Sequence, residues 1–149
     1  MKFSRADEAT QKKIYELALQ RTKYLNNWDI VDTAAAPIVG AYLLDKPRSI
    51  LLKLAKSNNI WERRISIIAS QTFIRHGEFT DTLKISEILL KDEHDLIHKA
   101  VGWMLREVGN RNTSTEERFL KKHVKRMPRT MLRYAIEKFP EKTRQKYLR

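Results

Sequence analysis

Apolar residues recur every three to four positions along the whole chain, and short polar or proline-containing segments interrupt them. This spacing places the apolar side chains on one face of a helix, so it predicts helices from end to end. The predicted helices cover residues 6–25, a stretch from 28 that Pro37 interrupts, one that opens at Lys46-Pro47, and then 61–76, 80–91, 95–108, 116–127, 128–139 and 140–148.

Residues that favour helix ends mark the boundaries of these helices. Pro37 lacks a backbone N–H, so it predicts a kink in its helix or a division of it. Gly77 is expected to adopt the left-handed conformation that commonly ends a helix, and Gly109-Asn110 is expected to end the helix that begins at 95. Ser114 with Glu117 matches a capping box for the helix 116–127.

The predicted helices come in pairs joined by short turns, and nothing between them resembles a linker. Trp61-Glu62-Arg63-Arg64 and Trp103-Met104-Leu105-Arg106 share the pattern W-x-x-R and lie 42 residues apart. Paired helices that repeat at about 40–47 residues are typical of HEAT and armadillo arrays. We therefore expect an all-α fold, an α-solenoid of HEAT-like antiparallel helix pairs that forms a single domain over residues 1–149. A compact helical bundle is the alternative.

Composition excludes several classes of protein. The chain has no Cys, which rules out a disulfide scaffold, a thiolate zinc site and a Cys nucleophile. Its 4 Gly are too few to build a glycine-rich phosphate loop. No apolar run approaches the roughly 18 residues of a membrane span, and the start of the chain lacks the apolar stretch of a signal peptide. These absences favour a soluble, intracellular protein.

The formal net charge is +12, and residues 118–149, with 12 basic and 2 acidic side chains, carry +10 of it. Such a concentration favours nucleic acid as the partner over acidic proteins or a membrane surface. Arg63 and Arg64 lie in the first turn of a predicted helix, where a bound phosphate would offset the unfavourable helix dipole. The alternatives are a solvated face, which is the default for such residues, and a surface pair with Glu62. The C-terminal cations that we expect to contact DNA, rather than only solvent, are Lys121, Lys122, Lys125, Arg126, Arg129 and Arg133.

Trp28 and Asp32 are the first candidates for chemistry. They are four residues apart, so a helix places them on one face. A carboxylate beside an indole attracts a cation, the first through its charge and the second through its ring quadrupole. The alternative is that Trp28 packs in the core while Asp32 caps the helical stretch that follows.

Trp103 is the second candidate. It lies at the margin of the apolar stripe of its helix, with Lys99 and Arg106 about one turn to either side. Gly102 precedes it, and a glycine inside a helix costs about 1 kcal/mol relative to alanine, which indicates the close approach of another group. The alternative is a tryptophan at the edge of the core that cationic side chains cover.

His94 and His98 have a spacing that can hold zinc on a helix. A third ligand is missing from the sequence around them. We therefore expect no metal site.

Four motifs in the same order resemble the AlkD family, the HEAT-like-repeat DNA glycosylases that remove alkylated purines. They are NNWDIVD at 26–32, WERR at 61–64, HKAVGWMLRE at 98–107 and MPRTMLRYA at 127–135. The resemblance implies hydrolysis of the N-glycosidic bond of N3- or N7-alkylated purines in double-stranded DNA, in base excision repair. It implies no metal and no organic cofactor.

The resemblance also implies roles for individual residues. Trp28 and Trp103 match the two aromatic walls beside the deoxyribose of the lesion, Asp32 matches the catalytic carboxylate, and Arg64 matches the active-site arginine. An alkylated purine is already a cation and a good leaving group, so the barrier lies in the positive charge that develops on the sugar. Asp32 is then expected to stabilise that charge and to orient the attacking water.

Members of this family usually carry several more helices ahead of the first one here. The chain therefore resembles the C-terminal two thirds of a full-length protein, and we expect an incomplete DNA surface to weaken affinity and turnover. The resemblance also suggests a bacterial cytoplasm, and we expect a monomer. The alternative function is a non-catalytic HEAT-like module that binds nucleic acid, or an inactive fragment of the glycosylase.

Overall fold

The computed structural model of the protein describes residues 3–22 and 28–149, and within these ranges every regular element is a helix. The protein is all-α, as predicted. The first half forms α1 (Glu8–Thr22), α2 (Trp28–Ala34), α3 (Ala41–Leu43), α4 (Ser49–Ala55), α5 (Ile60–Ile68) and α6 (Gln71–Arg75). The second half forms α7 (Thr80–Leu89), α8 (Asp95–Arg111), α9 (Thr113–His123), α10 (Arg129–Ala135) and α11 (Glu141–Leu148). The described residues also form three short segments of other helix types, the 3-10 helices η1 (Phe3–Arg5) and η3 (Val124–Arg126) and the π-helix η2 (Ala35–Gly40).

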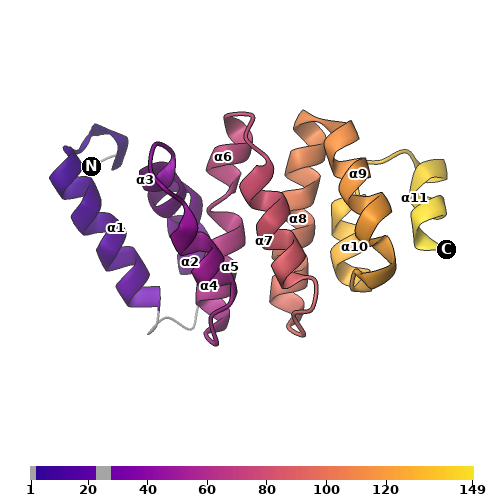
Figure 1. Ribbon diagram of the computed structural model, residues 1–149, viewed down its shortest axis with the longest axis horizontal. Helices are drawn as coiled ribbons and strands as arrows, with labels where there is room; N and C mark the ends of the chain where they lie inside the picture. The colour runs from indigo at the N-terminus through magenta and orange to yellow at the C-terminus, as the bar shows by residue number, and fades with distance from the viewer. Residues whose placement is uncertain (1–2, 23–27) are drawn as a thin grey trace.

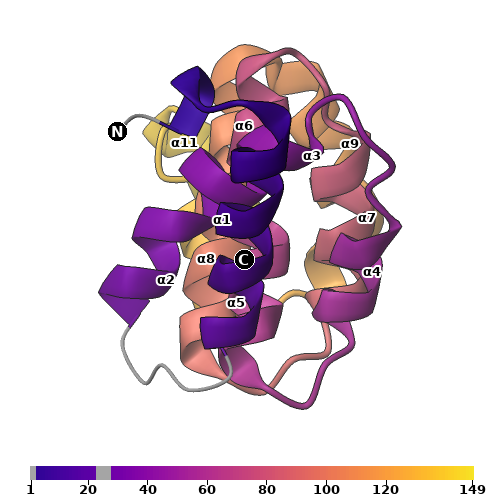
Figure 2. The same ribbon diagram turned by 90° about the vertical axis from the view of Figure 1, so that its left-hand side faces the viewer.

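The helices follow one another along the long axis of the molecule, from α1 at one end to α11 at the other (Figure 1). Seen from the α1 end, they form two layers (Figure 2). One layer holds α2, α5, α8 and α10, each packed against the next, and we call it the α2–α10 layer. The other, the α4–α9 layer, holds α4, α7 and α9, each packed against a helix of the first layer.

The hydrophobic core lies between the two layers and runs along the whole stack. Ile65, Ile67 and Ile68 of α5 are all buried, so neighbours enclose this helix on more than one side. Full burial of one such side chain stabilises the fold by roughly 1.5–3 kcal/mol. Tyr15 stacks on Tyr42 with ring centroids 4.2 Å apart, which attaches α1 to α3.

The stretch after α2 continues through Pro37 without a break, because the π-helix η2 replaces the predicted kink or division. The wider turns of a π-helix accommodate a missing backbone donor. The hydroxyl of Thr72 donates to the carbonyl of Ala36 at 2.7 Å. A Cβ added to Gly40 would lie 2.3 Å from the carbonyl oxygen of Ala69. The glycine therefore lets η2 approach the backbone between α5 and α6.

The prediction of one continuous helix over 61–76 is wrong, because α5 ends at Ile68 and α6 begins at Gln71. At the interruption, the hydroxyl of Ser70 donates to the carbonyl of Ile67 at 2.6 Å. The same hydroxyl accepts from Thr82 of α7 at 2.8 Å. Hydroxyl groups that bond to nearby backbone compete with the helical hydrogen bonds, which accounts for the break.

Gly77 ends α6 as predicted, with a positive φ of 78°. The N–H of Gly77 donates to the carbonyl of Ile74, and the N–H of Glu78 donates to that of Phe73, both at 2.9 Å. These two bonds form the Schellman motif, for which glycine at the left-handed position is favoured.

Gly109 does not end α8, which continues two residues beyond it. A Cβ at position 109 would lie 1.9 Å from the Oε1 atom of Glu116, so the glycine makes room for α9. The predicted capping box at Ser114 is also wrong. Asn112 caps α9 instead, and its side-chain oxygen accepts a backbone N–H of the first turn at 3.1 Å.

Pro128 and Pro140 immediately precede α10 and α11, in agreement with their predicted positions at helix starts. α10 is shorter than predicted, because it ends at Ala135 rather than at 139. Within residues 3–22 and 28–149, none of the helices combines the length and the apolar character needed to cross a bilayer.

Candidate active site

Asp32 of α2 and Arg64 of α5 form an ion pair within the α2–α10 layer. Arg64 Nε donates to Asp32 Oδ1 at 2.8 Å, and Arg64 Nη2 donates to Asp32 Oδ2 at 3.0 Å. The guanidinium thus holds both carboxylate oxygens, the geometry in which arginine binds carboxylates most strongly. The side chain of Arg64 is 8% exposed and that of Asp32 is 18% exposed. The pair is therefore largely withdrawn from water, while the carboxylate keeps some access to solvent.

The third guanidinium nitrogen of Arg64, Nη1, donates to the backbone carbonyl of Leu96 in α8. One side chain of α5 therefore links α2 to α8. The start of α5 is fixed by Asn59, whose side-chain oxygen accepts from the backbone N–H groups of Trp61 at 2.8 Å and Glu62 at 3.3 Å. Because every guanidinium nitrogen has a protein partner, Arg64 holds the Asp32 carboxylate in a defined position.

Arg64 also lines a cavity of about 390 Å³ between α5, α8 and α10. The other lining residues are Leu96, Lys99, Trp103, Arg106 and Tyr134. Arg64 and Arg106 occupy the same position in the two W-x-x-R segments, and both arginines line this one cavity. Aromatic rings and cations thus line this space, and one of these cations, Arg64, holds the Asp32 carboxylate.

The indole of Trp103 is oriented by its own helix. Its Nε1 donates to Glu107 Oε1 at 3.2 Å, one turn further along α8. A Cβ added to Gly102 would lie 2.5 Å from the carbonyl oxygen of Met131 and 2.5 Å from the Cβ of Tyr134. The close approach that Gly102 predicted is therefore that of α10, and it brings Tyr134 to the same cavity as Trp103.

The remaining cations of the cavity have acidic partners at its rim. Lys99 Nζ lies 3.3 Å from Asp95 Oδ2, one turn earlier on α8. Arg106 is paired with Glu137, which follows α10. Both pairs are partly exposed, so a phosphate could compete for these cations at modest cost.

Trp28 is the first residue of α2, one helical turn before Asp32. Its side chain lies outside the described residues, as do positions 26 and 27 of the NNWDIVD motif, so its place beside Asp32 stays a prediction. The alternative in which Asp32 caps a following helix is wrong. Asp32 lies inside α2, and its carboxylate bonds to Arg64.

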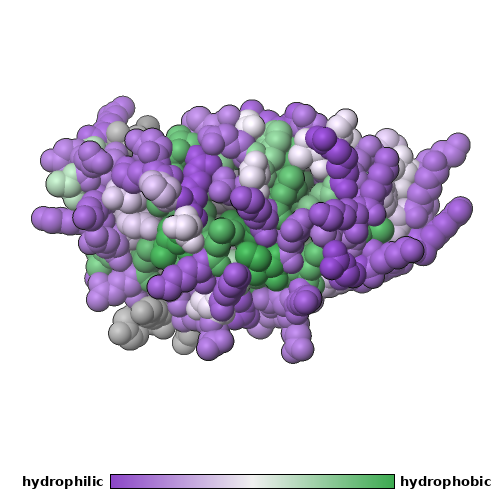
Figure 3. Space-filling view, in the orientation of Figure 1, coloured by the Kyte–Doolittle hydropathy of each residue, from purple (hydrophilic) through white to green (hydrophobic). Residues whose placement is uncertain are grey.

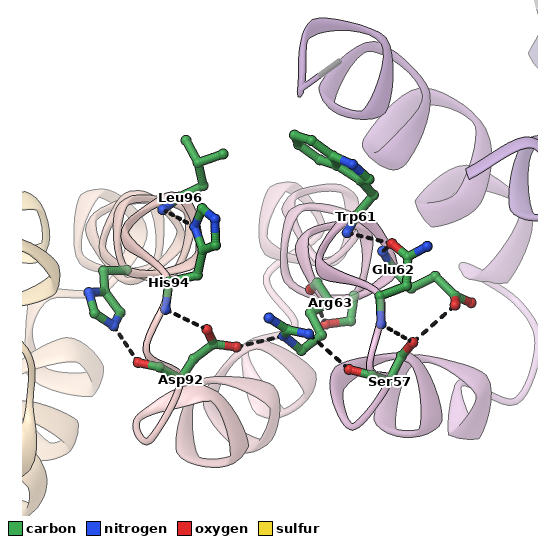
Figure 4. A network of polar contacts seen from close by, with 10 residues as sticks. Ser57, Trp61, Glu62, Arg63, Asp92, His94 and Leu96 are labelled. Carbon is green, nitrogen blue, oxygen red and sulfur yellow. Dashed lines mark hydrogen bonds and ion pairs between the residues drawn. The ribbon is translucent and has the colours of Figure 1, made fainter. Parts of the chain in front are cut away.

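Arg63 has partners within the protein (Figure 4). Its Nε donates to Asp92 Oδ2 at 2.7 Å, and its Nη1 donates to the carbonyl of Ser57 at 3.0 Å. Asp92 also accepts from the backbone N–H of His94 at 2.9 Å. This network ties the turn before α5 to the turn before α8. Contact between Arg63 and DNA stays a prediction.

His94 and His98 both bond to the backbone around the start of α8. His94 Nδ1 accepts from the N–H of Leu96 at 3.2 Å, and His98 Nε2 contacts the carbonyl of Asp92. In the part of the chain that the structure describes, no three His, Asp or Glu side chains are grouped so as to hold a metal ion.

The predicted DNA-contacting cations of the C-terminal region are all exposed, but they are divided between the two layers. Lys121 and Lys122 are on α9, Lys125 and Arg126 are on η3, and Arg129 and Arg133 are on α10. Lys122 Nζ lies 3.7 Å from Glu87 Oε1 of α7, and Arg126 donates to Nδ1 of the buried His123 at 2.7 Å. Contact between these cations and DNA stays a prediction.

Sequence reasoning missed three groups at the cavity. Two of them lie in the motifs that resemble the AlkD family, Glu107 in the motif at 98–107 and Tyr134, which is 37% exposed, in the motif at 127–135. The motifs therefore could have indicated these two residues. The carbonyl of Leu96 carries no such signal, because any residue supplies a backbone acceptor. Its role follows only from the position of Arg64.

The model of a protein family described as DNA alkylation repair enzyme matches residues 2–139. The match covers most of the chain and includes Asp32, Arg64, Trp103 and Tyr134. The protein belongs to the DNA alkylation repair enzyme family. A search of curated proteins gives no match to the chain.

Proposed function

We propose that the protein is a DNA glycosylase that hydrolyses the N-glycosidic bond of cationic N3- or N7-alkylated purines in double-stranded DNA. We propose further that its helices form a HEAT-like solenoid whose α2–α10 layer faces the DNA. Two observations support the solenoid: each helix of that layer packs against the one that follows it in the layer, and the pattern W-x-x-R occurs twice in the sequence, 42 residues apart. The observation that carries the activity is a carboxylate, Asp32, held at both oxygens by Arg64, which itself lines a cavity with Trp103.

The chemistry needs little from the protein beyond charge and position. The bond between C1′ of the deoxyribose and the purine nitrogen breaks, and its electron pair neutralises the alkylated base as it leaves. A water oxygen then bonds to C1′, and the proton that this water loses passes to the Asp32 carboxylate and from there to solvent. Because the leaving group is already cationic, no general acid is required, and the barrier lies in the oxocarbenium character of the sugar.

Asp32 supplies the negative charge that this sugar requires. Two unit charges about 4 Å apart interact by about 4 kcal/mol at the effective dielectric near a protein surface. Arg64 offsets part of this attraction, so we expect a net effect of about 3 kcal/mol, or roughly 100-fold in rate. In return, Arg64 fixes both carboxylate oxygens, and the lone pairs that it leaves free can accept a hydrogen bond from the attacking water.

Trp103 contributes a flat aromatic wall to the cavity that Arg64 also lines, which we call the lesion cavity. The negative face of an indole attracts cations, which suits both the alkylated base and the sugar. Glu107 accepts from the indole N–H and so positions the ring. Trp28, one turn before Asp32, supplies the second wall in this proposal. A module that only binds phosphate has no use for a carboxylate at its site, since Asp32 would repel the ligand.

Release of base from a duplex that contains a single N7-methylguanine tests the proposal. With enzyme in excess, the wild type should release the base, and Asp32→Asn should slow release by about 100-fold while keeping its affinity for DNA. The matched control is Asp45→Asn, because Asp45 is an exposed carboxylate that pairs with Lys46, whereas Asp32 pairs with Arg64 of the lesion cavity. That variant should release base at the wild-type rate.

Two outcomes would contradict the proposal. Equal release by wild type and Asp32→Asn would remove the carboxylate from the mechanism. No release by a folded wild type that binds the duplex would favour the alternative, a nucleic-acid-binding module without catalysis. Circular dichroism melting of each variant shows whether it is folded at the assay temperature.

A further inference from the structure

A second cavity, of about 380 Å³, lies at the C-terminal end of the stack, where η3, α10 and α11 meet. Four cations line it, Lys125 from η3, Arg129 from α10, Lys146 from α11 and Arg149 after α11, together with Tyr147. No acidic side chain is among the residues that line it in the described part of the chain, although Glu116 and Glu117 lie near enough to Tyr147 to affect its pKa. Hydrophilic side chains project from this end of the molecule (Figure 3). We call it the terminal cavity.

The acidic residues of the C-terminal region bond elsewhere. Only Glu137 and Glu141 are acidic between residues 118 and 149. Glu137 is paired with Arg106 at the lesion cavity. Glu141 accepts from Arg144 at 2.5 Å and from Gln145 at 2.7 Å on its own helix. The local charge of the terminal cavity is therefore not balanced by the carboxylates of its own segment.

The geometry of the terminal cavity holds these cations together despite their repulsion. Arg129 donates to the carbonyl of Leu148 at 2.5 Å, which fixes the last turn of α11 against α10. Burial raises the pKa of the Tyr147 phenol, and the carboxylates of Glu117 and Glu116 raise it further. The phenol is therefore a neutral hydrogen-bond donor at ordinary pH. Gathered cations beside a hydroxyl donor, in a concave site, match the chemistry of a phosphate group.

We propose that the terminal cavity binds a backbone phosphate of DNA, because its four cations and the Tyr147 phenol supply the charge and the hydrogen-bond donors that a phosphate needs. The choice of DNA as the source of the phosphate rests on the proposed function.

The test compares two double variants that lose equal charge. Lys125→Gln with Lys146→Gln removes two cations of the terminal cavity, and Lys84→Gln with Lys91→Gln removes two exposed cations on and beside α7. Binding to an undamaged fluorescent duplex is measured by anisotropy between about 50 and about 300 mM salt. A lysine that contacts a phosphate contributes about 1 to the slope of log affinity against log salt. We expect the terminal-cavity pair to reduce the slope by about 2, and the α7 pair to leave it close to that of the wild type.

Equal slopes for the two double variants would overturn the proposal. Thermal unfolding in the presence of inorganic phosphate shows whether the terminal cavity binds a free anion rather than a phosphate of DNA. If phosphate protects the wild type against thermal unfolding, but not the terminal-cavity variant, while both bind DNA with one slope, the cavity holds a free anion and the proposal fails. Because the duplex carries no lesion, these results do not depend on base release. A failure of the glycosylase assay therefore leaves this test intact.

Discussion

The Asp32–Arg64 ion pair leads to a stability prediction that needs no DNA. Arg64→Gln removes the guanidinium that bonds both oxygens of Asp32 and leaves a carboxylate that is only 18% exposed without its partner. Breaking a fully buried pair costs about 3–5 kcal/mol. Because Asp32 keeps some contact with water, we expect a loss of about 2–3 kcal/mol in the free energy of unfolding. For a chain of this size, that corresponds to a fall in Tm of roughly 8 °C.

A double-mutant cycle isolates the pair from other effects of each substitution. Urea unfolding of wild type, Asp32→Asn, Arg64→Gln and the double variant should give a coupling energy of about 2 kcal/mol. The matched control is the exposed pair of Lys12 and Glu16, 4.0 Å apart with side chains about 60% exposed, for which the coupling should be no more than about 0.5 kcal/mol. A coupling energy for Asp32 and Arg64 as small as that of the control would show that Arg64 does not hold the Asp32 carboxylate in position.

Three further predictions concern α8 and the helices that pack against it. Burial raises the pKa of Glu116 to about 8, and the neighbouring Glu117 contributes to this rise. The folded state therefore loses stability as the pH rises from about 4.5 to about 8. At about pH 9, Glu116→Gln should be more stable than the wild type by up to about 5 kcal/mol, with no such gain at about pH 4. Glu107→Leu should slow base release about tenfold at unchanged DNA affinity, whereas Glu107→Gln, which keeps an acceptor for the indole of Trp103, should retain most of the rate; equal rates for the two would contradict the positioning role. Gly102→Ala should cost about 3 kcal/mol in thermal unfolding, because its Cβ would lie 2.5 Å from α10, and a wild-type Tm would contradict that contact.

The predictions made from the sequence were most reliable where the signal is local. Helical periodicity gave the all-α class, and Gly77 marked a helix end, because each depends on residues within a few positions of one another. The break in the predicted helix 61–76 lies at Ser70, whose hydroxyl bonds to the carbonyl of Ile67 and also accepts from Thr82 of α7, a partner that is distant in the sequence. Gly109 was misread for a similar reason, since what requires a glycine there is the Glu116 side chain of the next helix.

The candidate site shows the same division. The sequence placed Asp32 and Trp103 among the residues of interest, and the motifs included Arg64. The hydrophobic periodicity, however, does not indicate that Arg64 bonds to a carboxylate 32 residues before it and to a carbonyl 32 residues after it. Nor does charge along the chain indicate that Arg63, its neighbour, bonds to Asp92 instead. Such pairings depend on how helices stack, and a single sequence does not encode them locally.

If the Asp32 carboxylate stabilises a positively charged sugar, the protein should bind a cationic mimic of that sugar more tightly than a neutral one. Two duplexes are compared, one with a cationic pyrrolidine in place of the damaged deoxyribose and one with the neutral tetrahydrofuran of the same shape. The wild type should bind the cationic duplex at least about tenfold more tightly, and Asp32→Asn should lose that preference. An equal preference for the cationic duplex in both proteins would contradict the account.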